Sequence, residues 1–98
     1  MRVTFDPAAS DELDRIFAWI AKDNPRAAVE MIARIEAKVM RLEPPELSHM
    51  GRPGLVEGTR ELLEWPYIIV YKVYEERDEI VVVSVVHGAR DREGREGK

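Results

Sequence analysis

Residues 57–88 read EGTRELLEWPYIIVYKVYEERDEIVVVSVVHG and contain three runs rich in β-branched and aromatic residues. Pro66 separates the first run from the second, and the polar stretch 75–78 separates the second from the third. Such runs with short breaks predict a three-stranded antiparallel meander. The middle run, 67–74, is apolar on both faces, so we expect it to be an interior strand. Charged residues in 60–64 place the first run nearer an edge of the sheet.

The residues before this meander predict one short strand and two helices. Residues 1–5 alternate between apolar and polar side chains, which is typical of a strand with one buried face. Asp6-Pro7 and Asn24-Pro25 are both start signals for a helix, since the first residue can accept from free amides and the proline fits the first turn. Apolar stripes then predict an antiparallel hairpin of helices over 8–22 and 25–43. The expected fold is α+β in two layers, with the order β-α-α-β-β-β, in a single domain over residues 1–98.

A helical hairpin can cover only one face of such a sheet. We therefore expect the apolar side chains on the other face to be covered by a partner. The connection from 46 to 58 is long enough to be a contact surface, and the polar end of the chain, 89–98, is expected to be mobile.

Composition restricts the classes of function. The chain contains no cysteine, which excludes disulfides, zinc thiolate sites and a cysteine nucleophile, and is compatible with the cytoplasm. A net charge of −4 and a pI near 5.2 disfavour specific nucleic-acid binding. No run is long enough to span a membrane, and we expect neither a metal nor a cofactor because His and carboxylates lack ligand spacing.

Several phrases in order resemble the ParE/RelE superfamily of toxins from type II toxin–antitoxin pairs. They are LDRIFAWIA at 13–21, NPRAA at 24–28, GTREL at 58–62, YIIVY at 67–71 and VVHGARD at 85–91. The resemblance runs from Val3 to Asp91. It implies a bacterial protein that a ParD-like antitoxin holds inactive, of the kind linked to plasmid stabilization.

The superfamily has two activities: RelE-like members cut messenger RNA in the ribosome, whereas ParE-like members poison DNA gyrase. RelE-like members commonly carry an arginine at the position of Ile68 and a tyrosine near the C-terminus, but no tyrosine follows Tyr74 here. These departures favour the ParE-like branch, in which gyrase itself performs the DNA chemistry. Two alternatives stay open: a ribosome-dependent endoribonuclease, and a degenerate module that binds antitoxin without toxicity.

Candidate site residues follow from the residue types and from the resemblance. If the chain inhibits gyrase, no catalytic residue is expected. If it is an endoribonuclease, His87 would act with Arg60 or Arg90. Arg60 is equally compatible with ordinary ion pairs to Glu61 or Glu64, and His87 with a structural role. The candidates for contact with antitoxin or target are Trp19, Arg60, Tyr71, His87, Arg90 and Arg92.

Overall fold

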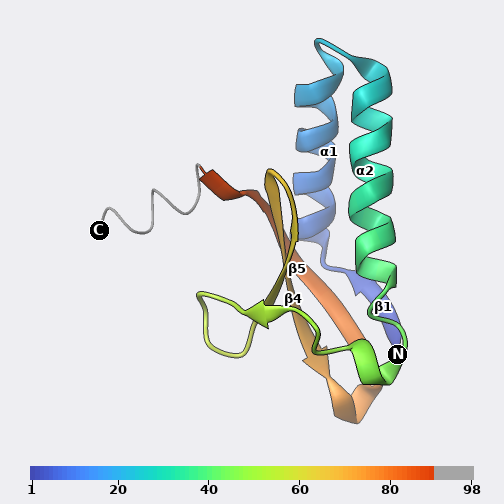
Figure 1. Cartoon of the computed structure of the whole chain (residues 1–98), viewed down its shortest axis with the longest axis vertical. Helices are drawn as coiled ribbons and strands as arrows, with labels where there is room; N and C mark the ends of the chain where they lie inside the picture. The colour runs from blue at the N-terminus through green and yellow to red at the C-terminus, as the bar shows by residue number, and fades with distance from the viewer. Residues whose placement is uncertain (90–98) are drawn as a thin grey trace.

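A computed structural model describes residues 1–89 and has the predicted order of elements with one addition (Figure 1). It contains β1 (Arg2–Phe5), α1 (Pro7–Ala21), α2 (Pro25–Met40), β2 (Arg52–Pro53), β3 (Arg60–Glu64), β4 (Tyr67–Tyr74) and β5 (Glu79–His87), with short 3-10 turns at Pro45–Leu47 and Glu75–Arg77. The strands form one sheet in the order β1-β5-β4-β3-β2. The predicted α+β class is confirmed, and β2 is the strand that the sequence did not predict.

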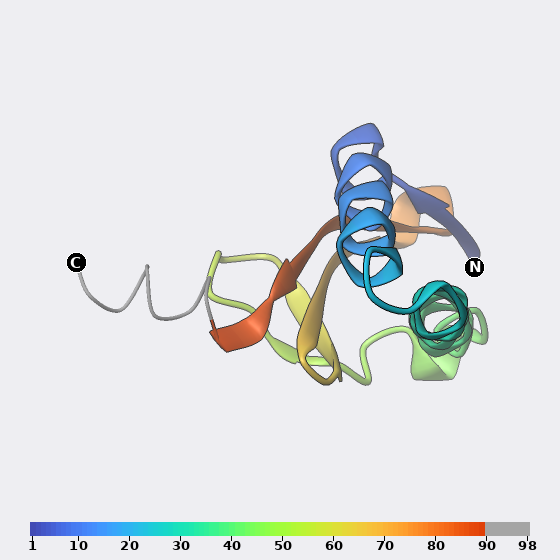
Figure 2. The same cartoon turned by 90° about the horizontal axis from the view of Figure 1, so that it is seen from above.

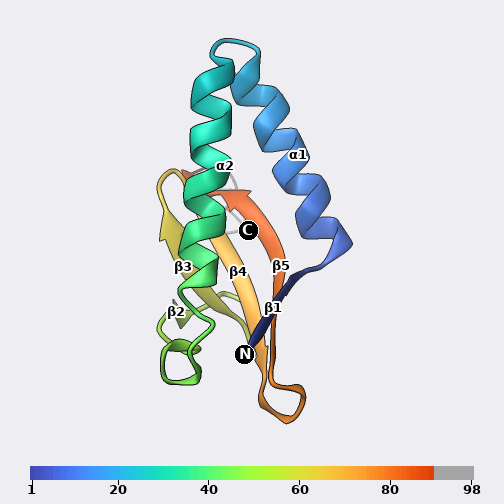
Figure 3. The same cartoon turned by 90° about the vertical axis from the view of Figure 1, so that its right-hand side faces the viewer.

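Both helices start where the Asx-Pro pairs predicted. The Asp6 side chain accepts from the Ala8 amide at 2.9 Å, and the Asn24 side chain accepts from the Ala27 amide at 3.1 Å. Each satisfies one of the amides that a helix leaves free in its first turn. The second helix ends at Met40, before the predicted boundary at residue 43. Figures 1 and 3 show that the tip of the hairpin projects beyond the sheet.

The helices cover one face of the sheet, as Figure 2 shows from above. β4 is the central strand, between β3 and β5, which confirms the prediction for residues 67–74. The register of β4 against β5 shifts between Val70 and Tyr71, because β5 has an extra residue between Val82 and Ser84. Alternate residues of β4 face the helices, whereas the core residues of β5 change phase at this point, from Ile80 and Val82 to Val85. The core lies between the two layers and contains Ala9, Ile35, Val39, Leu42, Leu62, Tyr67, Ile69, Tyr71, Ile80, Val82 and Val85.

The N-terminal strand has a partner that the sequence order does not suggest. β1 pairs in parallel with β5, from Arg2 opposite Glu79 to Phe5 opposite Val82. The other three strand pairs are antiparallel. A parallel pair requires a long crossover connection, and here almost the whole chain supplies it.

The expectation of an uncovered far face holds only in part. Leu63 and Trp65 are 46% and 65% exposed, whereas Ile68, which faces Leu63 across β3 and β4, is only 4% exposed. Gly88 packs close to the Ile68 side chain, because a Cβ at Gly88 would lie 3.3 Å from Ile68 Cδ1. The chain itself therefore covers part of this face.

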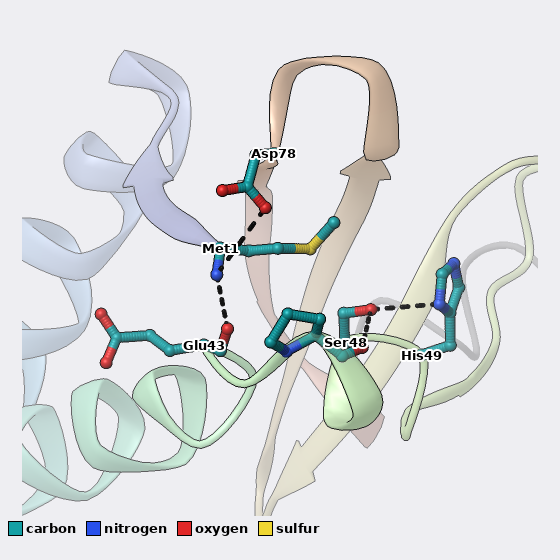
Figure 4. Close-up of polar contacts among 6 residues, drawn as sticks. Met1, Glu43, Ser48, His49 and Asp78 are labelled. Atoms are coloured by element: carbon teal, nitrogen blue, oxygen red, sulfur yellow. Dashed lines mark hydrogen bonds and ion pairs between the residues drawn. The ribbon is translucent and has the colours of Figure 1, made fainter.

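Polar contacts hold the start of β1 against the segment that follows α2 (Figure 4). The Met1 nitrogen donates to the Glu43 carbonyl at 2.6 Å and lies 3.9 Å from an Asp78 carboxylate oxygen. In the next turn, the Ser48 hydroxyl donates to the Pro45 carbonyl at 2.9 Å and lies 3.1 Å from His49 Nδ1. These contacts tie the end of the helical layer to the turn between β4 and β5.

Candidate partner-binding groove

A concave region of about 550 Å³ lies between α1 and the ends of β4 and β5. We call it the α1–β5 groove, and it is lined by Glu12, Arg15, Ile16, Trp19, Tyr67, Val85, Val86 and His87. Two predicted contact residues, Trp19 and His87, meet there although they are far apart in the sequence.

One face of α1 forms the helical wall of the groove. Glu12, Ile16 and Trp19 are four and three residues apart, so they lie on the same side of the helix. Trp19 is 61% exposed, and Lys22 Nζ lies 5.2 Å from its ring centroid. Trp19 thus contributes a large, partly exposed aromatic surface to the groove.

The strand wall carries a histidine packed edge-on against a tyrosine. The rings of Tyr67 and His87 are 5.6 Å apart between centroids, with an interplanar angle of 83°. The two residues face each other across β4 and β5. Within residues 1–89, His87 Nδ1 is buried without a hydrogen-bond partner, so a group entering the groove would bond to it only if the ring moved.

Glu12 connects the two walls. Its Oε1 accepts from the Val85 amide at 2.9 Å, and the Ser84 hydroxyl lies 3.1 and 3.3 Å from its two carboxylate oxygens. The side chain of a helix thereby satisfies a backbone donor of β5.

Arg60 lies outside this groove, on β3. Its guanidinium donates to the Gly51 carbonyl, and the Tyr71 hydroxyl accepts from the Gly51 amide at 3.0 Å. Its acidic neighbours contact other cations: Glu61 pairs with Arg52 at 3.2 Å, and Glu64 lies 3.4 Å from Arg34 and 3.6 Å from Lys38. Arg60 therefore holds the connection after α2 against the sheet.

Tyr71, which was predicted as a contact residue, lies in the core. Its side chain is 0% exposed and belongs to the core, with its hydroxyl bound to Gly51. The helices bury this aromatic residue of the central strand in the free chain, without a partner. Arg90, Arg92 and most of the expected mobile tail lie outside the described residues.

Sequence reasoning missed Glu12, Arg15 and Tyr67 as groove residues. The helical spacing of Glu12 and Trp19 was a usable signal for the first, since both flank the buried stripe of α1. Tyr67 gave no such signal, because its place in the groove depends on how far β5 extends.

His87 and Arg60, which the endoribonuclease alternative would use together, lie far apart within residues 1–89. General acid–base chemistry requires two groups within hydrogen-bond reach of the reacting atoms. In the sheet register, Arg60 of β3 lies opposite Tyr71 at one edge of β4, and His87 of β5 lies opposite Tyr67 at the other edge. At ~3.3 Å per residue and ~4.8 Å per strand, their backbones are about 16 Å apart. Residues 1–89 contain no group of three His, Cys, Asp or Glu arranged to hold a metal ion.

The family model for "ParE toxin of type II toxin-antitoxin system, parDE" matches residues 3–92. The chain belongs to the ParE toxin family. It is a toxin of a type II toxin–antitoxin system. A curated relative of this ParE-family chain, named "Putative toxin Y4kP", comes from Sinorhizobium fredii and is 40% identical over 88 residues. That match covers 88% of this chain and 86% of the relative.

Solved structures share the fold of this family member. The chromosomal ParDE system of P. aeruginosa matches with a TM-score of 0.75 and 24% identity, over 89% of this chain and 95% of that one. The RelBE2 toxin–antitoxin complex of Mycobacterium tuberculosis matches with a TM-score of 0.57 and 25% identity, over 88% of each chain. None of the helices within residues 1–89 has the length and apolarity needed to cross a membrane.

Proposed function

We propose that an antitoxin holds this toxin inactive by placing a segment in the α1–β5 groove. The observation that carries the proposal is the exposed Trp19 at the rim of a concave region with an apolar floor. Tryptophan is among the residues that most often dominate the energy of an interface. The related structures from P. aeruginosa and M. tuberculosis are named as toxin–antitoxin systems, which supports an antitoxin as the occupant.

The lining of the groove defines the chemistry of that segment. Ile16, Val85 and the Trp19 ring call for apolar side chains, and the exposed Arg15 favours a carboxylate. We expect an amphipathic segment with acidic residues at its margin.

We propose further that the freed toxin inhibits DNA gyrase in the cytoplasm by contact and without chemistry of its own. Three observations support this reading over messenger-RNA cleavage. Ile68 stands where RelE-like members commonly have arginine, and it is 4% exposed. The backbones of His87 and Arg60 are about 16 Å apart by strand geometry, and the Arg60 guanidinium is bound to the Gly51 carbonyl, which works against their joint action on one phosphate. Arg90, the other partner considered for His87, lies outside the described residues. The net charge of −4 works against binding RNA.

Supercoiling of relaxed plasmid by purified gyrase tests the proposal. We expect micromolar toxin to inhibit the reaction and the cognate antitoxin to restore it. Trp19→Ala toxin should inhibit gyrase while needing more antitoxin for the same restoration. Full supercoiling at micromolar wild-type toxin, together with codon-phased cuts in messenger RNA by primer extension, would support the endoribonuclease instead.

A further inference from the structure

β5 continues past the end of its neighbour β1. The pairing of β1 with β5 stops at Phe5 opposite Val82, and the Asp6 amide makes the last contact, to the Val82 carbonyl at 2.9 Å. β5 itself runs on to His87. From residue 83 onward, β5 therefore has β4 on one side and no strand of residues 1–89 on the other.

The backbone groups at this open edge can be assigned. The Gly88 amide donates to the Pro66 carbonyl at 2.7 Å, so Gly88 faces the β4 side. The Val85 amide donates to Glu12, on the side of α1. Since successive amides of a strand point to opposite edges, the His87 amide faces the same open edge as Val85. An edge with free backbone donors and acceptors is a template for pairing with another strand.

Glu12 occupies the position that the carbonyl of such a strand would take. Its carboxylate accepts from the Val85 amide and also contacts the Ser84 hydroxyl. A strand approaching this edge has to displace these bonds. It also has to bury or expel a charged group, which costs more than it would for a neutral side chain.

We propose that Glu12 guards the open edge of β5 against antiparallel pairing with a second copy of this chain. Two copies related by a two-fold axis near Val85 would bring their Glu12 carboxylates together at the new seam. Like charges opposed across paired strands are destabilising, and each copy would also lose its bond from Val85. The free toxin is then monomeric, whichever partner fills the groove.

Sedimentation velocity compares the self-association of the untagged wild-type chain with that of Glu12→Ala, at protein concentrations of about 5 to 500 µM. We expect wild type to stay monomeric and Glu12→Ala to dimerise at least about tenfold more tightly, the factor that about 1.4 kcal/mol represents. Asp11→Ala is the matched control, because it removes an exposed carboxylate one residue earlier on the same helix and should stay monomeric.

Glu12→Gln is a second variant for the case in which Glu12→Ala does not fold. It keeps an acceptor oxygen and loses the charge, so its self-association should lie between wild type and Glu12→Ala. Amide exchange locates the contact: Val85 and His87 amides should exchange more slowly in the dimer of the variant than in its monomer. A folded Glu12→Ala that is as monomeric as wild type would overturn the proposal, as would a dimer with unchanged exchange at these amides. If Glu12→Ala does not fold, Glu12→Gln that associates no more than wild type overturns it.

Discussion

Trp19 and His87 come from opposite ends of the described chain and line the same groove, because α1 lies against the end of β5. Trp19 is 61% exposed, but Trp65 is 65% exposed, so exposure alone does not mark a binding residue. At the scale of the residue, the place of Trp19 in the groove is what supports a binding role.

Trp19→Ala should therefore weaken antitoxin binding with little effect on the fold. We expect a loss of about 2 kcal/mol in binding, or about 30-fold in Kd, by calorimetric titration with the antitoxin. The free energy of unfolding should change by less than about 0.5 kcal/mol. Trp65→Ala is the matched control, since Trp65 is 65% exposed beside Leu63 and Ile68, away from the groove. Equal effects of the two substitutions would remove Trp19 from the interface.

Arg60→Ala should show the opposite pattern. Its guanidinium bonds to the Gly51 carbonyl, and hydrogen bonds to charged groups are worth about 1.5–3 kcal/mol. We expect the free energy of unfolding in urea to fall by about that amount, with antitoxin affinity nearly unchanged for the folded fraction. Arg26→Ala, at an exposed position of α2, is the control for loss of a cation. Unchanged stability with lost affinity would return Arg60 to the contact surface.

For single residues, the sequence indicates the face of an element on which a side chain lies better than it indicates what that side chain contacts. Trp19 could be recognised because it flanks the apolar stripe of its helix. Tyr71 could not be excluded from sequence, since a tyrosine on a two-sided apolar strand is compatible with either surface. Its hydroxyl is bonded to Gly51, which is 20 positions earlier, and such a contact depends on the path of the whole connection.

At the scale of the element, local signals acted as expected. The Asx-Pro pairs set the helix starts, and the two-sided apolar run became the central strand. The pairing of β1 with β5 was outside the reach of these signals, because alternation predicts a strand but not its neighbour. β2 has only two residues and depends on pairing with β3, so its own sequence carries no strand pattern.

Asn24→Ala tests the start of α2. The lost bond to the Ala27 amide should lower the free energy of unfolding by about 1 kcal/mol, measured from the urea midpoint. Asp23→Ala, one residue earlier in the same exposed link, should leave the midpoint nearly unchanged. If both substitutions lower the midpoint equally, the capping bond is not the cause.

At the scale of the whole molecule, two layers place a groove at the open end of the sheet. The fold class could be predicted from sequence because every element except β2 has a local signal and a short chain allows few arrangements. The groove could not, because it depends on β5 extending past β1 and on α1 crossing that end. The far face is a milder case: of the residues expected to need a partner there, Ile68 is covered with the help of Gly88, while Leu63 and Trp65 beside it are exposed.

A titration of purified gyrase with this toxin tests most directly whether the molecule acts by binding. We expect the loss of supercoiling to follow the ratio of toxin to gyrase, and added antitoxin to restore supercoiling in proportion to the toxin that it binds. Supercoiling that is unaffected at micromolar toxin would contradict inhibition by contact. If the toxin also cuts a molar excess of ribosome-bound messenger RNA, the molecule is a catalyst.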